Sequence, residues 1–165
     1  MDAKMNKKDI KKLLHHREPY LMVDTVRELS DSEIKTSKTT QNDEPYIQGH
    51  FPNAPVIPGA MLQEFCTQSA GILLTKYYSG VEDYDSDNTK GYAIGVLNKI
   101  ETAKFYNICK PGKIESEVKL LSHHENLYKF IARVTQNGEL MAKIKFNLVN
   151  TSDEILTSSQ NQDTP

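Results

Sequence analysis

Tryptophan is absent from the sequence, cysteine occurs twice among 165 residues, and no uninterrupted apolar run is long. The spacing of Cys66 and Cys109 does not match that of zinc ligands, and two cysteines are too few for the disulfide framework of a small secreted domain. We therefore expect an intracellular, cytoplasmic protein. No apolar stretch approaches the roughly 20 residues that a membrane-spanning helix needs, and residues 1–10 lack the apolar core of a signal peptide.

The sequence also lacks an excess of either charge. Its 20 lysines and arginines nearly balance 22 aspartates and glutamates, and basic residues are not interleaved with aromatic ones. This composition argues against nucleic acid as a partner. The length suits one domain with its own hydrophobic core, which we predict to span residues 1–150. Residues 151–165 contain no aromatic residue and no periodic pattern, so they are predicted to form a disordered tail.

A proline-rich loop and the segment after it dominate the middle of the chain. Pro52, Pro55 and Pro58 each fix φ and remove a backbone donor, so residues 51–58 are predicted to be neither helix nor central strand. From Ala60 to about residue 78, apolar residues recur at spacings of three and four, which indicates an amphipathic α-helix. We expect this long helix to be the central buried element of the domain.

Alternating apolar and polar residues predict that most of the remaining chain forms an antiparallel sheet. The dipeptide Asn137-Gly138 is typical of a two-residue hairpin turn between the last two strands. A short N-terminal helix is predicted to be capped by Asn6 or Asp9, and the acidic stretch 79–90 to be an exposed loop. The helix is predicted over 7–15 and the strands over 20–29, 33–41, 91–97, 100–106, 114–120, 128–134 and 142–148, with 91–97 and 100–106 forming one strand or two. Periodicity alone thus predicts the α+β class.

Two polar residues, Glu64 and Gln68, interrupt the apolar helix. They are four positions apart, so they share one face, and such groups on a buried helix must be paired or functional. His50 precedes Glu64 by fourteen positions on the loop that leads into the helix. A histidine, a carboxyl group and the free N–H groups of a helix start are the components of an acid–base site with oxyanion donors. Taken alone, His50 would better fit a structural histidine bonded to a backbone carbonyl, and the Glu64–Gln68 pair would also fit a subunit interface.

Residues 49–68, GHFPNAPVIPGAMLQEFCTQ, resemble the signature of the β-hydroxyacyl-[acyl carrier protein] dehydratases of the FabZ type. That family has a histidine in a Gly-His-Phe-Pro context, then Pro-Val-x-Pro-Gly, a glutamate fourteen residues after the histidine and a glutamine four residues later. His50, Glu64 and Gln68 match these positions. The stretch HREPY at 16–20 is similar to the family's opening strand, and KPG at 110–112 to a turn of the family. The resemblance covers about residues 10–150.

The resemblance implies a hotdog fold, in which an antiparallel β-sheet wraps around one long central α-helix. It also implies a homodimer whose sheets join edge to edge, further assembled as a trimer of dimers. The implied reaction is the dehydration of (3R)-hydroxyacyl groups to trans-2-enoyl groups in fatty acid or related lipid biosynthesis. The acyl group would be carried on the phosphopantetheine of acyl carrier protein, and no metal or organic cofactor is expected.

The resemblance also assigns roles to individual residues. His50 would act as the base, and an imidazole that is partly neutral at pH 7 suits that role. Glu64 would act as the acid if its apolar surroundings keep it protonated, and Gln68 would orient Glu64 or a water. The Gly59 N–H at the helix start would bind the thioester oxygen. The family places the histidine and the glutamate of one site on opposite protomers, and the positions that bind substrate would also include Phe51 and Val56.

Two other functions stay open. A hotdog acyl-thioesterase would direct water at the thioester carbonyl, and a non-catalytic hotdog subunit would only bind acyl chains. The intact His-Phe-Pro loop argues against the first, and the presence of both His50 and Glu64 argues against the second. Gln63, Phe65 and Cys66 replace smaller or aliphatic residues of the family, so the length and shape of the preferred acyl chain are left open. Cys66 is predicted to be a core residue rather than a nucleophile.

Overall fold

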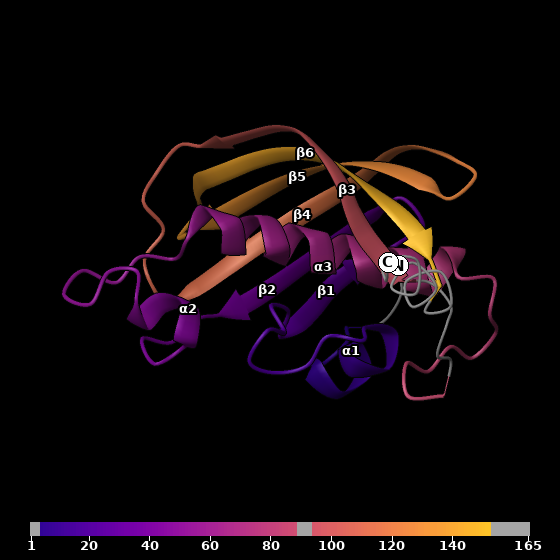
Figure 1. Ribbon diagram of the computed structural model, residues 1–165, viewed down its shortest axis with the longest axis horizontal. Helices are drawn as coiled ribbons and strands as arrows, with labels where there is room; N and C mark the ends of the chain where they lie inside the picture. Colours follow the sequence, from indigo (N-terminus) through magenta and orange to yellow (C-terminus); the bar gives the residue numbers. More distant parts are fainter. Residues whose placement is uncertain (1–3, 89–93, 153–165) are drawn as a thin grey trace, which may run out of the picture.

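The computed structural model describes residues 4–88 and 94–152. One six-stranded antiparallel sheet has the strand order β1-β2-β4-β5-β6-β3, and the long helix α3 lies across it (Figure 1). The helices are α1 (Lys7–Leu13), α2 (Pro45–Gln48) and α3 (Gly59–Tyr78), and the strands are β1 (Thr25–Leu29), β2 (Glu33–Thr39), β3 (Ile94–Phe105), β4 (Lys113–His124), β5 (Leu127–Gln136) and β6 (Glu139–Thr151). The α+β prediction is confirmed. No helix within the described ranges combines the length and the apolar character needed to cross a membrane.

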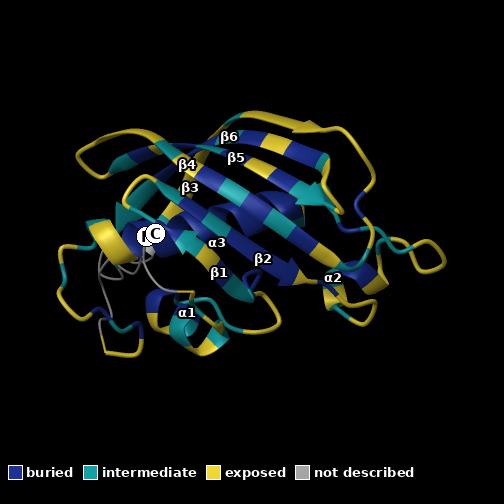
Figure 2. Cartoon of the chain, turned by 180° about the vertical axis from the view of Figure 1, so that it is seen from behind, coloured by how far each residue is buried: buried dark blue, intermediate teal, exposed yellow. Residues whose placement is uncertain are grey.

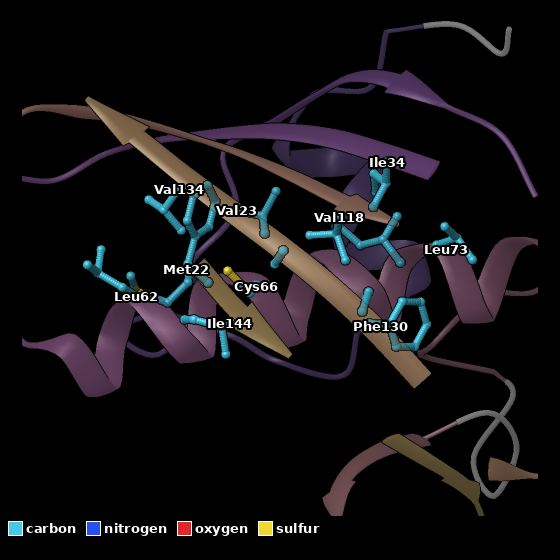
Figure 3. Close-up of a cluster of buried hydrophobic side chains, with 14 of the residues drawn as sticks. Met22, Val23, Ile34, Leu62, Cys66, Leu73, Val118, Phe130, Val134 and Ile144 are labelled. Carbon is cyan, nitrogen blue, oxygen red and sulfur yellow. The ribbon is translucent and has the colours of Figure 1, made fainter. Parts of the chain in front are cut away.

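Helix α3 is the buried centre of the domain. Every residue from Leu62 to Thr75 except Glu64 is buried, because side chains of the sheet pack against the helix on one side and residues 14–22 contact it elsewhere. Figure 3 shows Cys66 of α3 among buried side chains of the sheet and of the segment that contains Met22. Cys66 has no exposed surface, and burial raises the pKa of its thiol. The thiol therefore stays protonated, and its prediction as a core residue is confirmed.

Three buried hydroxyl groups fix α3 against the sheet. Thr36 Oγ1 of β2 lies 2.8 Å from Ser69 Oγ of α3 and 2.7 Å from Ser116 Oγ of β4. Ser69 Oγ also donates a hydrogen bond to the Phe65 carbonyl oxygen at 2.7 Å. Buried hydroxyls need such partners, and hydrogen bonds are directional. The contacts therefore set the position of the helix along β2 and β4, and with it the position of Glu64.

The strand predictions are confirmed where the pattern is regular. Buried and less buried residues alternate along β5 (Figure 2). At the turn between β5 and β6, Asn137 has φ 52° and Gly138 has φ 81°, the pair of positive φ values that a type I′ hairpin requires. Strand β3 is one strand rather than two, with register shifts near residue 98 and near residue 101. Residues 91–93 of its predicted start and residues 153–165 of the predicted tail lie outside the described ranges.

The predicted strand at 20–29 is wrong over its first half, because β1 begins only at Thr25. Leu21, Met22 and Val23 are buried, as their apolar character suggested. However, the backbone N–H of Met22 donates to the side-chain oxygen of Gln68 at 2.7 Å instead of to a neighbouring strand. This segment therefore packs against α3, and its hydrophobicity reflects contact with a helix.

The acidic stretch predicted to be an exposed loop over 79–90 is not simply exposed in its described part, residues 79–88, while residues 89–90 lie outside the described ranges. Tyr84 and Ser86 are buried, and Ser86 caps the end of α1. Its N–H donates to the Lys12 carbonyl oxygen at 2.7 Å and its hydroxyl to the Lys11 carbonyl oxygen at 2.5 Å. The last carbonyl groups of a helix have no partner within the helix, so this loop satisfies them. Arg17 adds hydrogen bonds to Ser86 Oγ and to a carboxylate of the loop.

We expect Phe130→Ala to lower the free energy of unfolding by about 3–5 kcal/mol, because it leaves a cavity in the core. Phe130 is fully buried and stacks on Phe146 with ring centroids 5.6 Å apart. The neighbouring residue Lys129 is exposed on the same strand, so Lys129→Ala is a matched control that should change the free energy by about 0.5 kcal/mol or less. Urea unfolding of both variants measures the difference. Equal losses would show that β5 does not pack as described.

Candidate active site

The Glu64 carboxyl group lies in the second turn of α3 and is held by Gln68. Its side chain is 15% exposed, and its Oε1 accepts a hydrogen bond of 2.8 Å from Gln68 Nε2. The same amide nitrogen donates to the Tyr20 carbonyl oxygen at 2.8 Å, and the amide oxygen accepts from the Met22 N–H at 2.7 Å. These three contacts fix the amide orientation. Gln68 thereby positions Glu64 relative to the segment before β1.

Two further side chains approach the Glu64 carboxyl group from that segment. His16 Nε2 lies 3.7 Å from Glu64 Oε1, and the His16 ring stacks on the Tyr20 ring with centroids 6.1 Å apart. The Tyr20 hydroxyl also interacts with Glu64, and burial together with this neighbouring charge raises the pKa of Tyr20. His16 Nδ1 is buried and has no hydrogen-bond partner among residues 4–88 and 94–152. The sequence analysis assigned no role to His16, although this residue begins the HREPY stretch that resembles the family's opening strand.

Burial is also the main influence on the charge of His16. It lowers the pKa of the imidazole, the charge of Glu64 opposes that effect, and His15 and Arg17 add to the lowering. Burial disfavours a charged ring because a charge loses its hydration there. The shift makes neutral imidazole the main form of His16 at neutral pH. The preceding residue, His15, is close to Tyr84, with 2.6 Å between its Nε2 and the phenol oxygen.

His50 lies on the loop between α2 and α3, and its neutral tautomer is fixed by a backbone carbonyl. Its Nδ1 is 3.1 Å from the Val56 carbonyl oxygen. A carbonyl oxygen can only accept, so Nδ1 carries the proton and Nε2 keeps its lone pair. The Phe51 ring stacks on the imidazole with centroids 4.5 Å apart. The His50 imidazole is thus hydrogen-bonded to a backbone carbonyl, as expected for a structural histidine. Its other nitrogen, Nε2, keeps a lone pair that can accept a proton.

The loop itself is closed by backbone hydrogen bonds. The Val56 N–H donates to the His50 carbonyl oxygen at 2.9 Å, and the Ile57 N–H donates to the Cys109 carbonyl oxygen at 2.8 Å. Together with its prolines, these bonds leave the loop little freedom. Beside it, Ala54, Pro55 and Val56 form one wall of an open groove of about 660 Å³. The other lining residues are Thr39, Thr40, Gln41, Asn42, Ile108, Lys110, Pro111 and Gly112.

Gly59 begins α3, directly after the N-cap residue Pro58, which offers no side-chain cap. A Cβ atom at Gly59 would lie 3.0 Å from two ring carbons of Phe105, so the ring would have to shift to make room for it. The absence of a side chain therefore lets Phe105, at the end of β3, lie against the helix start. Within the described residues, the N–H groups of Gly59 and Ala60 donate to no protein acceptor, so they are free to bind an oxygen atom of a ligand.

The predicted site residues thus fall into two groups within one chain. Glu64 and Gln68 lie together, joined by His16 and Tyr20, while His50, Phe51 and Val56 lie together on the loop. In residues 4–88 and 94–152, no hydrogen bond or ion pair connects the two groups. The same residues contain no cluster of three or more histidine, cysteine, aspartate or glutamate side chains placed to hold a metal ion.

Comparisons with solved structures identify the fold. The dehydratase heterocomplex ApeI:P from Xenorhabdus doucetiae has a chain that matches with a TM-score of 0.75 at 16% identity, covering 93% of this chain and 97% of that one. A protein described as a putative thioesterase from Ralstonia eutropha matches with a TM-score of 0.56 at 14% identity, covering 75% and 82%. At such identities the likeness concerns the fold alone, and it confirms the predicted hotdog fold.

Comparisons of sequence place the family. The sequence model of the FabA-like domain matches residues 14–145. The 3-hydroxyacyl-[acyl-carrier-protein] dehydratase FabZ of Petrotoga mobilis is 36% identical over 148 residues, which are 86% of this chain and 99% of the relative. The FabZ of Coxiella burnetii is 34% identical over 141 residues, which are 84% and 94% of the two chains. This chain therefore belongs to the FabA-like family and, within it, to the 3-hydroxyacyl-[acyl carrier protein] dehydratases of the FabZ type.

Proposed function

We propose that this protein removes water from (3R)-hydroxyacyl groups on acyl carrier protein to give trans-2-enoyl groups, with His50 as the base and Glu64 as the acid. Family membership supports the reaction. One observation supports the division of roles: the Val56 carbonyl holds the His50 proton on Nδ1, so that Nε2 can accept a proton. Glu64, oriented by Gln68, can supply one. The acyl group would reach the site on phosphopantetheine, in the cytoplasm, without a metal or organic cofactor.

The proposed steps balance as follows. His50 Nε2 removes the proton from C2 of the acyl group, and the electron pair moves toward the thioester oxygen, where the Gly59 N–H stabilises the developing charge. The pair then forms the double bond between C2 and C3 as the C3–O bond breaks. Glu64 donates its proton to the departing hydroxyl group, which leaves as water. Phe51, stacked on His50, and Val56 would border the reacting atoms.

The open edge of the sheet supports assembly of two chains. Strand β3 is an outer strand, and large apolar side chains on it and just after it are exposed: Val96, Leu97, Ile100, Phe105, Tyr106 and Ile108. An exposed apolar edge is unfavourable in a monomer. We infer a homodimer in which two β3 strands meet, with His50 of one chain completing the site around Glu64 of its partner, and a trimer of such dimers.

The first test uses a synthetic (3R)-hydroxyacyl thioester on acyl carrier protein, with the product followed by mass spectrometry. Loss of one water is expected, and His50→Ala and Glu64→Gln should each lower the rate by about 10²–10⁴-fold, the usual contribution of a general acid or base. His124→Ala, at an exposed histidine of β4, is the matched control and should keep the wild-type rate. Release of free acid would instead indicate a thioesterase, and no reaction at any chain length a binding subunit.

Gln68→Met should lower both stability and activity. The loss of the amide leaves the Met22 N–H and the Tyr20 carbonyl oxygen without their partner, which should cost about 1–3 kcal/mol. Freed from Gln68, Glu64 should lose its position, with kcat falling about ten- to a hundredfold. Gln63→Met is the control, because Gln63 is also buried on α3 but bonds to Thr67. Equal effects of the two substitutions on kcat would contradict the orienting role.

Mixing two inactive variants tests the shared site. If His50 and Glu64 of one site come from different chains, a dimer of one His50→Ala chain and one Glu64→Gln chain contains one intact site. After complete exchange of subunits, half of the dimers are mixed and half of their sites are intact, so activity should recover to about a quarter of the wild-type value. Activity that stays at the level of the separate variants would place both residues of a site in one chain.

A further inference from the structure

The proposed reaction leaves Glu64 without its proton after every turnover. His50 ends each turnover with an extra proton and Glu64 with one fewer, so His50 must release a proton to solvent and Glu64 must regain one. The Glu64 side chain is only 15% exposed and lies on a buried helix. Among the residues that the structure describes, the titratable side chains that interact with its carboxyl group are His16 and Tyr20.

His16 lies between this carboxyl group and the outside of the molecule. Its Nε2 is 3.7 Å from Glu64 Oε1, while 32% of its side chain is exposed. Its Nδ1 has no partner among the described residues, so this nitrogen is not committed to a structural hydrogen bond. Most buried ring nitrogens are committed in that way. The imidazole thus has one nitrogen that faces the carboxyl group and a second nitrogen that is buried and without a partner among the described residues.

A small cavity adjoins the ring. It has a volume of about 20 Å³, enough for about one water molecule. Its polar lining includes His16, Thr67, Gln68 and Thr75, and its other lining residues are Leu13, Leu14, His15, Gly71 and Gly95. Two of the lining residues, Gly71 and Gly95, have no side chain, and a Cβ atom at Gly95 would lie 3.9 Å from the Cα of Gly71. The cavity thus offers space for about one water molecule, bordered by His16 and by residues of α3.

We propose that His16 returns the proton to Glu64 between turnovers. The inference rests on the proposed function, and His16 is a positioning and proton-relay residue that acts through Glu64. A proton from solvent adds to one ring nitrogen of neutral His16, giving the imidazolium. The Nε2 proton then passes to the Glu64 carboxylate, which becomes the carboxylic acid again, and the imidazole is neutral. Loss of the Nδ1 proton to solvent and uptake of a proton at Nε2 then restore the starting tautomer.

The charges around His16 favour this sequence. When Glu64 is ionised, its negative charge raises the pKa of His16 and favours uptake of a proton. Once Glu64 is neutral, that attraction ends, and burial together with His15 and Arg17 lowers the pKa of His16. The ring is therefore driven to take up a proton when Glu64 lacks one and to stay neutral otherwise. Tyr20 does not suit this task, because its raised pKa keeps the phenol protonated at neutral pH.

The test compares one turnover with many. Enzyme in excess of the acyl substrate gives the rate of a first turnover, for which Glu64 is already protonated, and substrate in excess gives kcat. For His16→Gln we expect a first turnover within about twofold of wild type, an unchanged KM, and a kcat lowered about tenfold or more. Added imidazole should restore kcat, because a small base can carry the proton in place of the missing ring. His16→Asn should behave in the same way, and thermal melting confirms that both variants fold.

His124→Gln is the matched control, since it makes the same replacement at an exposed histidine of β4 and leaves the surroundings of Glu64 unchanged. It should leave both the first turnover and kcat within about twofold of wild type. Three results would overturn the relay: equal losses in single and multiple turnovers for His16→Gln, no rescue by imidazole, or a kcat that does not fall. A failure of the proposed function itself is recognised separately, because Glu64→Gln would then keep the first-turnover rate.

Discussion

The side chain of Gln68 is the contact on which both the fold and the site depend. It binds two backbone groups of residues 20–22 and the Glu64 carboxyl group, all in a region from which water is largely excluded. Hydrogen bonds are stronger in such surroundings, and an unpaired polar group there is correspondingly costly. Because the Met22 N–H donates to Gln68, it does not take part in strand pairing. In return, the Glu64 carboxyl group, the central helix and the segment that carries His16 hold fixed relative positions.

The loop that carries His50 is held in place by different means. Around His50 the chain is shaped by prolines, which limit the backbone, and by a few backbone hydrogen bonds that close the loop. There the protein controls which nitrogen of the imidazole holds a proton, through the carbonyl group of Val56. One half-site is thus a buried network on a helix, and the other is a stiff loop beside an open groove. Such halves can meet when two chains associate, since each is already shaped alone.

The sequence patterns correctly predicted those features that depend on residues close together in the sequence. Spacings of three and four marked α3, and Asn137-Gly138 marked the hairpin because both positions need positive φ. Two of the failures share one cause, a partner far away in the sequence. The Met22 N–H is taken by Gln68, 46 positions later, and Ser86 is buried because it caps α1. The short helix α2 was missed for a local reason: Pro45 marks a turn, but it also suits the first position of a helix. His16 was within a recognised motif, yet only its distance to Glu64 gives it a role.

The capping of α1 by Ser86 has a consequence for how this protein can vary in evolution. Loops on a surface usually tolerate insertions and deletions. Here the acidic loop supplies the last hydrogen bonds of α1 and contacts His15 and Arg17, the two neighbours of His16 in the chain. A change in loop length would shift the residue beside the Glu64 carboxyl group. The length of this loop is therefore coupled, through His15 and Arg17, to the position of a side chain that the loop itself does not touch.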